Sequence, residues 1–275
     1  MRRFEGRNAI VTGASRGIGA AIAERLAAEG ASVVVTARTL DAHDHLDGSL
    51  TETLRRCRRH GAHAEAVAAD LGDPIDRQRI VPAAVDLLGG PIDILVNNAA
   101  AAIYQSMLDY SPRRRTITFE VNLQAPIDLA QAVIPAMMAR GEGWIVNVSS
   151  ATARAPSGPP FRTAGVATKV GIYGASKAAL NRATLAFAVE LQSAGVRINT
   201  VEPRAAVWSE GAQALLGQVD DSLVESMEAM VEAAVALCCC GPGHTGNTDI
   251  SLDLIDEMGL TVMNLDGQAP YVPHA

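Results

Sequence analysis

The stretch NAIVTGASRGIG at residues 8–19 decides the fold class of this chain of 275 residues. It begins as an apolar run and ends in a glycine-rich turn, and a helical pattern follows at once over residues 18–29. A second, β-branched run occupies residues 31–36. Strand, glycine turn, helix and strand within about thirty residues form a βαβ unit, which sets two parallel strands in one sheet.

The turn in this unit has the spacing Gly-x-x-x-Gly-x-Gly, not the Gly-x-Gly-x-x-Gly of the usual dinucleotide fingerprint. Small residues let backbone N–H groups and a helix N-terminus approach a phosphate closely. A purely structural turn is the alternative, but the position between a strand and a helix favours phosphate binding. The cofactor contacts expected here are Gly13, Ser15, Arg16, Gly17, Ile18 and Gly19.

Two arginines bear on which dinucleotide binds. Where the second strand ends, dinucleotide folds carry an acid for the ribose 2′-hydroxyl or an arginine for a 2′-phosphate. Ala37 and Arg38 stand at that place, and Arg16 in the glycine turn adds a second guanidinium. Both arginines could be solvated surface residues, but two guanidiniums near one phosphate position favour NADP(H).

The alternation of strand and helix continues along the chain. Further strands are expected at residues 64–69, 92–96, 143–148 and 197–201, and helices at 49–60, 73–88, 111–139 and 175–191. This order predicts a single doubly wound Rossmann-type α/β domain over residues 1–275, with helices on both faces of a parallel sheet. Ligands bind outside the carboxyl ends of such strands. The residues that follow the strands should therefore meet at one edge: Gly13, Arg38, Asp70, Asn97 and Ser150.

Tyr173 and Lys177 form a pair at helical spacing. Positions i and i+4 share one helix face. A cation close to a phenol favours the phenolate and lowers its pKa, which suits a general acid/base for a carbonyl or an alcohol. The alternative is a chance pair, in which a lysine extends past a half-buried tyrosine.

The composition excludes several classes of function. Hydrophobic residues make up 48% of the chain, charged residues 19%, and the net charge is −7. The acidic balance argues against nucleic-acid binding, and the sequence holds no apolar run long enough for a membrane span or a signal peptide. We therefore expect a cytoplasmic protein, in which the arginines of residues 55–59 form a solvated helix face.

The cysteines and histidines do not predict a metal site. Cys57 and the three cysteines at 238–240 lack the spacing of zinc ligands, and reduced, partly buried thiols are the expected state. His43, Asp44 and His45 lie in a polar, loop-like stretch without a third partner.

A set of motifs in a fixed order resembles one family. The set consists of Thr12-Gly13-x-x-x-Gly17-x-Gly19, Asp70, Asn97-Asn98-Ala99, Asn122, Ser150 and Tyr173-x-x-x-Lys177. The sequence resembles the short-chain dehydrogenase/reductases over residues 4–204, in particular bacterial 3-oxoacyl reductase-like members.

The resemblance implies a role for each of the catalytic candidates. Tyr173 would be the acid/base, and Lys177 would lower its pKa and hold the nicotinamide ribose. Ser150, rather than Ser149, would hydrogen-bond the substrate carbonyl, since such donors stabilise a developing alkoxide. Asn122 would interrupt its helix and anchor a water that relays protons to Lys177.

The resemblance also implies the remaining contacts and the activity. Asp70 with Leu71 would bind the adenine, Asn98 with Ala99 the adenosine ribose, and Pro203 would lie in a loop that meets the nicotinamide. The implied activity is NADPH-dependent reduction of a ketone or 3-oxoacyl-type carbonyl, or the reverse oxidation, by a homotetramer or homodimer. A catalytically silent NADP-binding regulator and a same-fold enzyme that eliminates or epimerises are the alternatives.

Several stretches depart from the family pattern. Ser150 and Tyr173 are farther apart than is usual, so residues 151–172 are expected to form an inserted loop over the active site. Pro203 is followed by arginine where the family has glycine, and residues 204–275 are expected to supply a substrate lid and a C-terminal segment. That segment should contain a helix at 215–237 and a last strand at 260–265. Apolar residues, namely Met107, Trp208 and Leu216, hint at a hydrophobic substrate.

Overall fold

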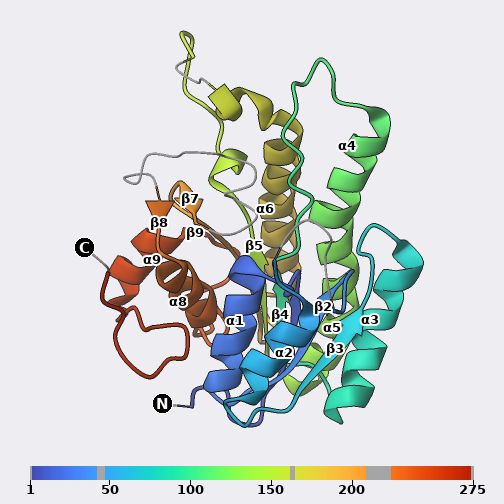
Figure 1. Cartoon of the computed structure of the whole chain (residues 1–275), viewed down its shortest axis with the longest axis vertical. Helices are drawn as coiled ribbons and strands as arrows, with labels where there is room; N and C mark the ends of the chain where they lie inside the picture. The colour runs from blue at the N-terminus through green and yellow to red at the C-terminus, as the bar shows by residue number, and fades with distance from the viewer. Residues whose placement is uncertain (1, 42–46, 162–164, 209–223, 274–275) are drawn as a thin grey trace.

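The computed structural model describes residues 2–41, 47–161, 165–208 and 224–273 of the chain. A seven-stranded sheet with the order β3-β2-β1-β4-β5-β6-β9 forms its centre (Figure 1), and every strand pairs in parallel with its neighbours. The strands are β1 Asn8–Thr12, β2 Ser32–Ala37, β3 Ala64–Ala68, β4 Ile94–Asn97, β5 Gly143–Val148, β6 Val196–Glu202 and β9 Thr248–Ile250. The predicted fold class is confirmed.

Helices cover both faces of the sheet. The helices are α1 Gly17–Ala28, α2 Leu50–Arg58, α3 Pro74–Leu88, α4 Pro112–Phe119, α5 Ala125–Arg140, α6 Gly171–Leu191, α8 Met227–Leu237 and α9 Ser251–Met258. One apolar cluster joins α1, α2, α8 and α9 to one face of the sheet, and a second joins α3, α5 and α6 to the other. Successive residues of β1 divide between the two clusters, as Ile10 and Val11 show. The strands are buried on both faces because parallel sheets are covered on both sides.

The helix starts follow from capping residues that the sequence provides. Ser49 accepts a hydrogen bond from the backbone N of Glu52 at 3.0 Å, and Asp73 accepts one from Ile75 N at 2.9 Å. Proline stands in the first turn of the helix that Asp73 caps, where its missing N–H costs nothing.

The long helix expected at 111–139 is interrupted. Residues Glu120–Gln124 form a π-helical turn between α4 and α5. The resemblance implied such an interruption at Asn122, which lies within this turn. A π-turn widens the helix locally and is frequent at functional sites.

The C-terminal part differs from the sequence-based expectations. The last strand of the sheet is β9, whereas the expected strand at 260–265 is wrong: Met263 there forms only an isolated bridge with Pro270. Of the helix expected at 215–237, residues 227–237 form α8, and residues 209–223 lie outside the described part of the chain. Val224–Glu225 is a strand, β8, paired with β7 at Ala206–Val207.

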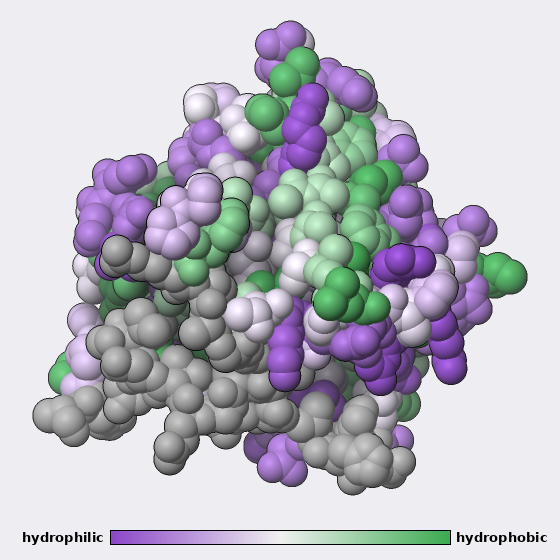
Figure 2. All heavy atoms as spheres, turned by 90° about the horizontal axis from the view of Figure 1, so that it is seen from above, coloured by the Kyte–Doolittle hydropathy of each residue, from purple (hydrophilic) through white to green (hydrophobic). Residues whose placement is uncertain are grey.

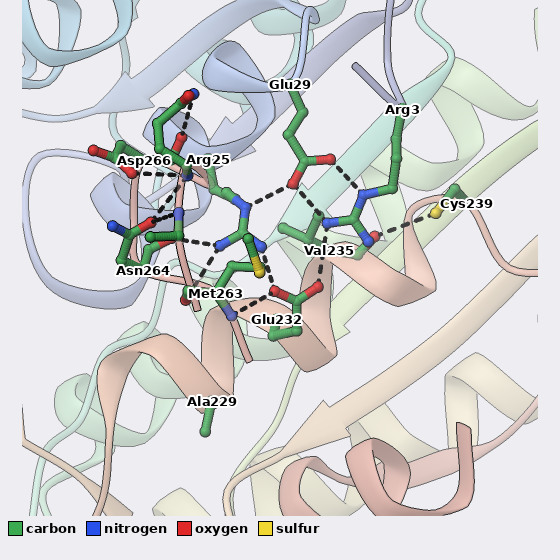
Figure 3. Close-up of polar contacts among 12 residues, drawn as sticks. Arg3, Arg25, Glu29, Ala229, Glu232, Val235, Cys239, Met263, Asn264 and Asp266 are labelled. Carbon is green, nitrogen blue, oxygen red and sulfur yellow. Dashed lines mark hydrogen bonds and ion pairs between the residues drawn. The ribbon is translucent and has the colours of Figure 1, made fainter. Parts of the chain in front are cut away.

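A buried ion network fastens the C-terminal segment to the first helix (Figure 3). Arg25 is 0% exposed; its guanidinium binds Glu29 at 2.6 Å and also pairs with Glu232. Arg3 completes the network by pairing with both carboxylates. Arg25 Nη1 also donates to the carbonyl oxygen of Asn264 at 2.8 Å. Two cations and two anions thus balance one another where α1, α8 and the last segment meet.

The arginines in and just after α2 make more contacts than the solvated helix face that the sequence predicted. Arg56 and Arg59 both pair with Glu24, which is buried on α1, while Arg55 pairs with Glu52 in the solvent. These contacts fasten α2 to α1. Among the described residues, no helix is long and apolar enough to cross a bilayer.

Candidate active site

The glycine turn after β1 is shaped for close approach. Gly13 has φ +63° and Gly17 has φ +54°, a left-handed conformation that favours glycine. A Cβ on Gly13 would lie 2.6 Å from the Cα of Ala99, and one on Gly19 would collide with the side chain of Asn98. The turn therefore forms a cradle that any larger side chain would fill.

The start of α1 in this cradle has no side-chain cap. Arg16 occupies the N-cap position, and its side chain makes no capping bond. Backbone N–H groups at the start of a helix need acceptors, and a phosphate supplies them. These features fit the diphosphate of a dinucleotide.

Thr12 ties the cradle to the segment after β4. Its hydroxyl accepts hydrogen bonds from the backbone N of Asn98 at 3.0 Å and of Ala99 at 3.1 Å. The amide of Asn98 in turn donates to the carbonyl oxygens of Thr12 and Gly13. Thr12 was not among the predicted site residues, although a hydroxyl residue at the end of the first strand signals this role.

The predicted cofactor residues of β2 and β3 lie where the strands end. Arg38 is exposed just past β2, and Arg16 is half-buried, with its Nε donating to the carbonyl oxygen of Asp47 at 2.9 Å. Asp70 is exposed after β3 and accepts a hydrogen bond from Gly72 N at 2.9 Å. Leu71 is buried, with its side chain in the core.

Lys177 lies inside the protein. Its side chain is 1% exposed, and its Nζ donates to the carbonyl oxygen of Val148, the last residue of β5, at 2.7 Å. Burial lowers the pKa of Lys177 to about 8, because an ammonium loses its hydration there.

The expected lowering of the Tyr173 pKa is not what the structure shows. Burial raises this pKa, the neighbouring Tyr104 raises it further, and a hydrogen bond with Ser150 acts in the opposite direction. Lys177 Nζ is 6.0 Å from the centre of the Tyr173 ring and bonded to Val148. Desolvation therefore outweighs the cation, and Tyr173 is held in its protonated form.

Ser150 is the serine that faces Tyr173. Its hydroxyl is also bonded to the hydroxyl of Thr152 at 2.9 Å, whereas Ser149 is buried and its hydroxyl has no hydrogen-bond partner among the described residues. Gly174, next to Tyr173, allows this arrangement, since a Cβ there would collide with the carbonyl oxygen of Thr152. Small residues thus bring the two catalytic candidates together.

Asn122 lies fully buried in the π-turn and braces the site. Its Oδ1 accepts from Ala101 N at 2.7 Å, and its Nδ2 donates to the hydroxyl of Ser176 at 3.0 Å. Ser176 is adjacent to Lys177 on α6. Asn122 therefore links the segment after β4 to the catalytic helix.

The loop after β6 is held by a residue that sequence reasoning missed. Arg154, four residues after Ser150, pairs with the buried carboxylate of Glu202 at 3.1 Å and donates to the carbonyl oxygens of Pro203 and Arg204. The side chain of Arg204 points to α9, where it pairs with Asp253 at 2.5 Å. Neither ion pair has a local sequence signal, since the partners are about fifty residues apart.

The comparisons with known proteins agree with this geometry. The sequence model described as "short chain dehydrogenase" matches residues 7–220. The chain belongs to the short-chain dehydrogenase/reductase family.

Relatives of this short-chain dehydrogenase/reductase include L-xylulose reductase of Bos taurus. It is 33% identical over 263 residues, which cover 91% of this chain and 96% of that protein. A 3-oxoacyl (acyl-carrier-protein) reductase of Agrobacterium tumefaciens, solved with NADP bound, has a TM-score of 0.76 at 29% identity, with coverage of 90% and 93%. A short chain dehydrogenase of Mycobacterium thermoresistibile has a TM-score of 0.80 at 28% identity, with coverage of 97% and 93%.

This short-chain dehydrogenase/reductase is thus an oxidoreductase whose fold binds a nicotinamide cofactor and a small-molecule substrate. Most of the residues described above lie in the segments that follow strands β1 to β6, whereas Tyr173 and Lys177 lie on α6. Because the strands are parallel, these segments leave the sheet at its carboxyl edge.

Proposed function

We propose that this enzyme reduces a ketone or 3-oxoacyl-type carbonyl with NADPH, or oxidises the matching secondary alcohol, and that Tyr173 is its acid/base. The observation that carries the proposal is the meeting of Ser150, Tyr173 and Lys177 at the carboxyl edge of the sheet, beside the glycine cradle.

The residues of the cradle and of the strand ends would hold the cofactor. The diphosphate fits the start of α1 and the turn, where Gly13, Ser15, Arg16, Gly17, Ile18 and Gly19 lie. Asp70 with Leu71 would hold the adenine, and Asn98 with Ala99 the adenosine ribose, while Pro203 would lie against the nicotinamide. Arg38 is exposed, and Ala37 and Arg38 stand where NAD-dependent folds carry an acid, which supports NADP(H) over NAD(H). The bound cofactor supplies the hydride.

The protein's own residues handle the proton. Tyr173 is protonated at neutral pH, so it can donate to the oxygen of a carbonyl that gains negative charge. Ser150, bonded to Tyr173, offers a second donor to that oxygen. Lys177 would hold the nicotinamide ribose and, with a pKa of about 8, would receive a proton relayed by a water anchored at Asn122, to replace the one that Tyr173 donates.

The surface around the site supports an apolar substrate. Figure 2 views the molecule from above Figure 1, onto the end where the loops after the strands lie, and shows green side chains bordered by purple ones. The exposed fractions are 58% for Met107, 95% for Leu108, 63% for Phe161 and 42% for Trp208. Met107 packs on Gly171, where a Cβ would lie 2.8 Å from its sulfur. Leu216 lies outside the described residues.

The inserted segment 151–172 would form the rim of the site. Its described parts, residues 151–161 and 165–172, lie at the same end of the molecule as the segment that precedes α4, at the top of Figure 1. Arg154 fastens one end to the loop after β6, and the carbonyl oxygen of Lys169 accepts Gln105 N at 2.9 Å at the other. Of the predicted lid and C-terminal segment, 204–275, the elements α8, β9 and α9 belong to the sheet and its cover, so among the described residues the lid role is proposed for 204–208. Residues 209–223 of this segment lie outside the described part of the chain.

The protein would act as a homotetramer or homodimer in the cytoplasm. Leu185 and Val189, one turn apart on α6, are 46% and 60% exposed and would be covered by a second copy. Light scattering after size exclusion tests this: a monomer at micromolar concentration contradicts it.

A panel of ketones and 3-oxoacyl thioesters, with NADPH oxidation as the readout, tests the activity. Turnover of at least one compound, faster with NADPH than with NADH, is expected. NADPH binding without turnover of any compound would instead favour the silent regulator, for which the intact Ser150, Tyr173 and Lys177 give no support.

A further inference from the structure

A second phenol touches the predicted acid/base. The rings of Tyr104 and Tyr173 have centroids 5.4 Å apart and are inclined at 61°, so they meet edge to face. Edge-to-face contact is a favoured arrangement of two aromatic rings and fixes their relative orientation. Tyr104 lies in the segment after β4, outside the motifs that carried the sequence-based predictions.

The backbone on either side of Tyr104 is anchored. The carbonyl oxygen of Ile103 accepts a hydrogen bond from the hydroxyl of Tyr110 at 3.0 Å. The backbone N of Gln105 donates to the carbonyl oxygen of Lys169 at 2.9 Å. With both neighbours held, the backbone that carries the Tyr104 ring is anchored beside α6.

Residues from three parts of the fold surround the Tyr173 phenol, which Tyr104 faces. Lys177 comes from the same helix as Tyr173, Ser150 from the end of β5, and Tyr104 from the segment after β4. Of these, Ser150 favours the phenolate of Tyr173, and Tyr104 disfavours it. Burial also raises the pKa of Tyr104, so both phenols are neutral at physiological pH.

We propose that Tyr104 is a positioning residue for the proton donor, whose ring holds the Tyr173 ring in one plane and covers it from water. This inference rests on the proposed role of Tyr173 as acid/base. The ring of Tyr104 would position and cover Tyr173, whereas its hydroxyl would have the smaller effect of raising the Tyr173 pKa. Substitutions that remove the whole ring or the hydroxyl alone separate the two contributions.

Tyr104→Leu removes the ring, whereas Tyr104→Phe keeps it. Loss of the ring exposes the Tyr173 phenol and lowers its pKa, and each pKa unit raises the phenolate fraction tenfold. Tetranitromethane nitrates phenolates, and peptide mass spectrometry locates the product, so the rate can be followed at Tyr173 without turnover. Tyr110 and Tyr271 in the same digest serve as internal standards.

We expect nitration of Tyr173 to be about tenfold faster in Tyr104→Leu than in the parent protein, and at most about threefold faster in Tyr104→Phe. Equal rates in all three proteins, or equal acceleration in both variants, would overturn the proposal. The measurement stands apart from the proposed function, because it needs no substrate: a failed ketone panel would leave the nitration result intact.

Kinetics with an accepted ketone provide the second readout. In Tyr104→Leu kcat should fall about tenfold with little change in the KM for NADPH. Tyr104→Phe, which keeps the ring, should retain most of the kcat of the parent protein. The apparent pKa of alcohol oxidation should move to lower pH in Tyr104→Phe, and Tyr271→Phe should leave it unchanged. If Tyr104→Leu does not fold, the nitration rate is measured with Tyr104→Met, which also removes the ring, and a rate equal to that of the parent protein contradicts the inference.

Discussion

Two of the buried polar clusters in the described part of this protein differ in how well their charges are matched. In the network of Arg3, Arg25, Glu29 and Glu232, each guanidinium meets a carboxylate (Figure 3). At the candidate active site the ammonium of Lys177 donates to a backbone carbonyl oxygen, and no carboxylate pairs with it in the contacts the structure describes. Buried charges that are matched hold elements together, whereas poorly matched ones have shifted pKa values and mark sites of chemistry.

The cost of the poor match is visible in the groups around Lys177. The pKa of Lys177 is lowered and that of Tyr173 is raised, in each case chiefly by burial. The hydroxyl of Ser149, which follows Val148, is buried without a partner. A bound cofactor and substrate would supply the missing contacts, so the site is arranged for ligands rather than for the stability of the empty protein.

The largest effect is expected for a substitution at the candidate active site. Tyr173→Phe keeps the ring and removes the proton donor, and general acid/base catalysis contributes about 10²–10⁴-fold. We expect kcat with an accepted ketone to fall by about 10³. The dissociation constant for NADPH, measured by fluorescence, should change less than about threefold. Equal loss of binding and turnover would show that the tyrosine supports the fold instead.

The contribution of the buried Arg–Glu network to the free energy of unfolding can be measured directly. Glu232→Gln leaves Arg25 buried with one carboxylate fewer, and breaking a buried pair in this way costs about 3–5 kcal/mol. Urea unfolding should show this loss, while kcat of the folded fraction stays within about twofold. Arg55→Gln, which breaks an exposed pair, is the control and should leave stability unchanged. A comparable loss in both variants would remove the distinction between buried and exposed pairs.

The pH dependence of stability sharpens the comparison. The pKa of Lys177 is lowered from 10.5 to about 8 on folding, so between these values the unfolded chain binds a proton that the folded chain releases. The stability cost of burying the ammonium is therefore fully present below pH 8 and disappears as the pH rises to 10.5.

Lys177→Met removes this titration. Relative to the variant, the parent protein should gain up to about 3 kcal/mol between pH 8 and pH 10.5 when unfolding is measured without cofactor. Parallel curves for the two proteins would mean that Lys177 is solvated in the empty enzyme.

The smallest expected effect concerns the exposed edge of the site. Arg38→Asp places an acid where NAD-dependent folds have one and removes a charge-assisted contact with the 2′-phosphate. The ratio of kcat/KM for NADPH over NADH should fall about ten- to hundredfold, in line with about 1.5–3 kcal/mol for such contacts. Arg113→Asp, another exposed arginine, is the matched control. An unchanged ratio would count against the cofactor assignment.

The features that the sequence predicted depend on residues that are close together in the chain, within one turn or one helix. The glycine turn and the Tyr173–Lys177 pair follow from spacing, and the alternation of elements follows from hydrophobic runs, so the fold class could be predicted and a candidate site could be named. The direction of the Tyr173 pKa shift was not, because it depends on burial and on Tyr104, 69 positions away in the chain. Contacts between distant segments leave no periodic signal.

The C-terminal part shows the same limit. The expected strand at 260–265 is mostly apolar, but in the folded chain it runs beside Arg25 as a loop, and β9 is formed by Thr248–Ile250, of which two of the three residues are polar. Edge strands need only main-chain pairing on one side, so a polar sequence suffices there.

The carbonyl oxygens of Met263 and Asn264 accept hydrogen bonds from Arg25, and Gly267 lies against the same guanidinium. Shortening the chain before residue 263 would leave donors of a fully buried guanidinium without acceptors in the middle of the protein. The C-terminal segment thus supplies acceptors that the buried guanidinium of α1 needs. Fusion partners and affinity tags are therefore better added after residue 275 than put in place of this segment.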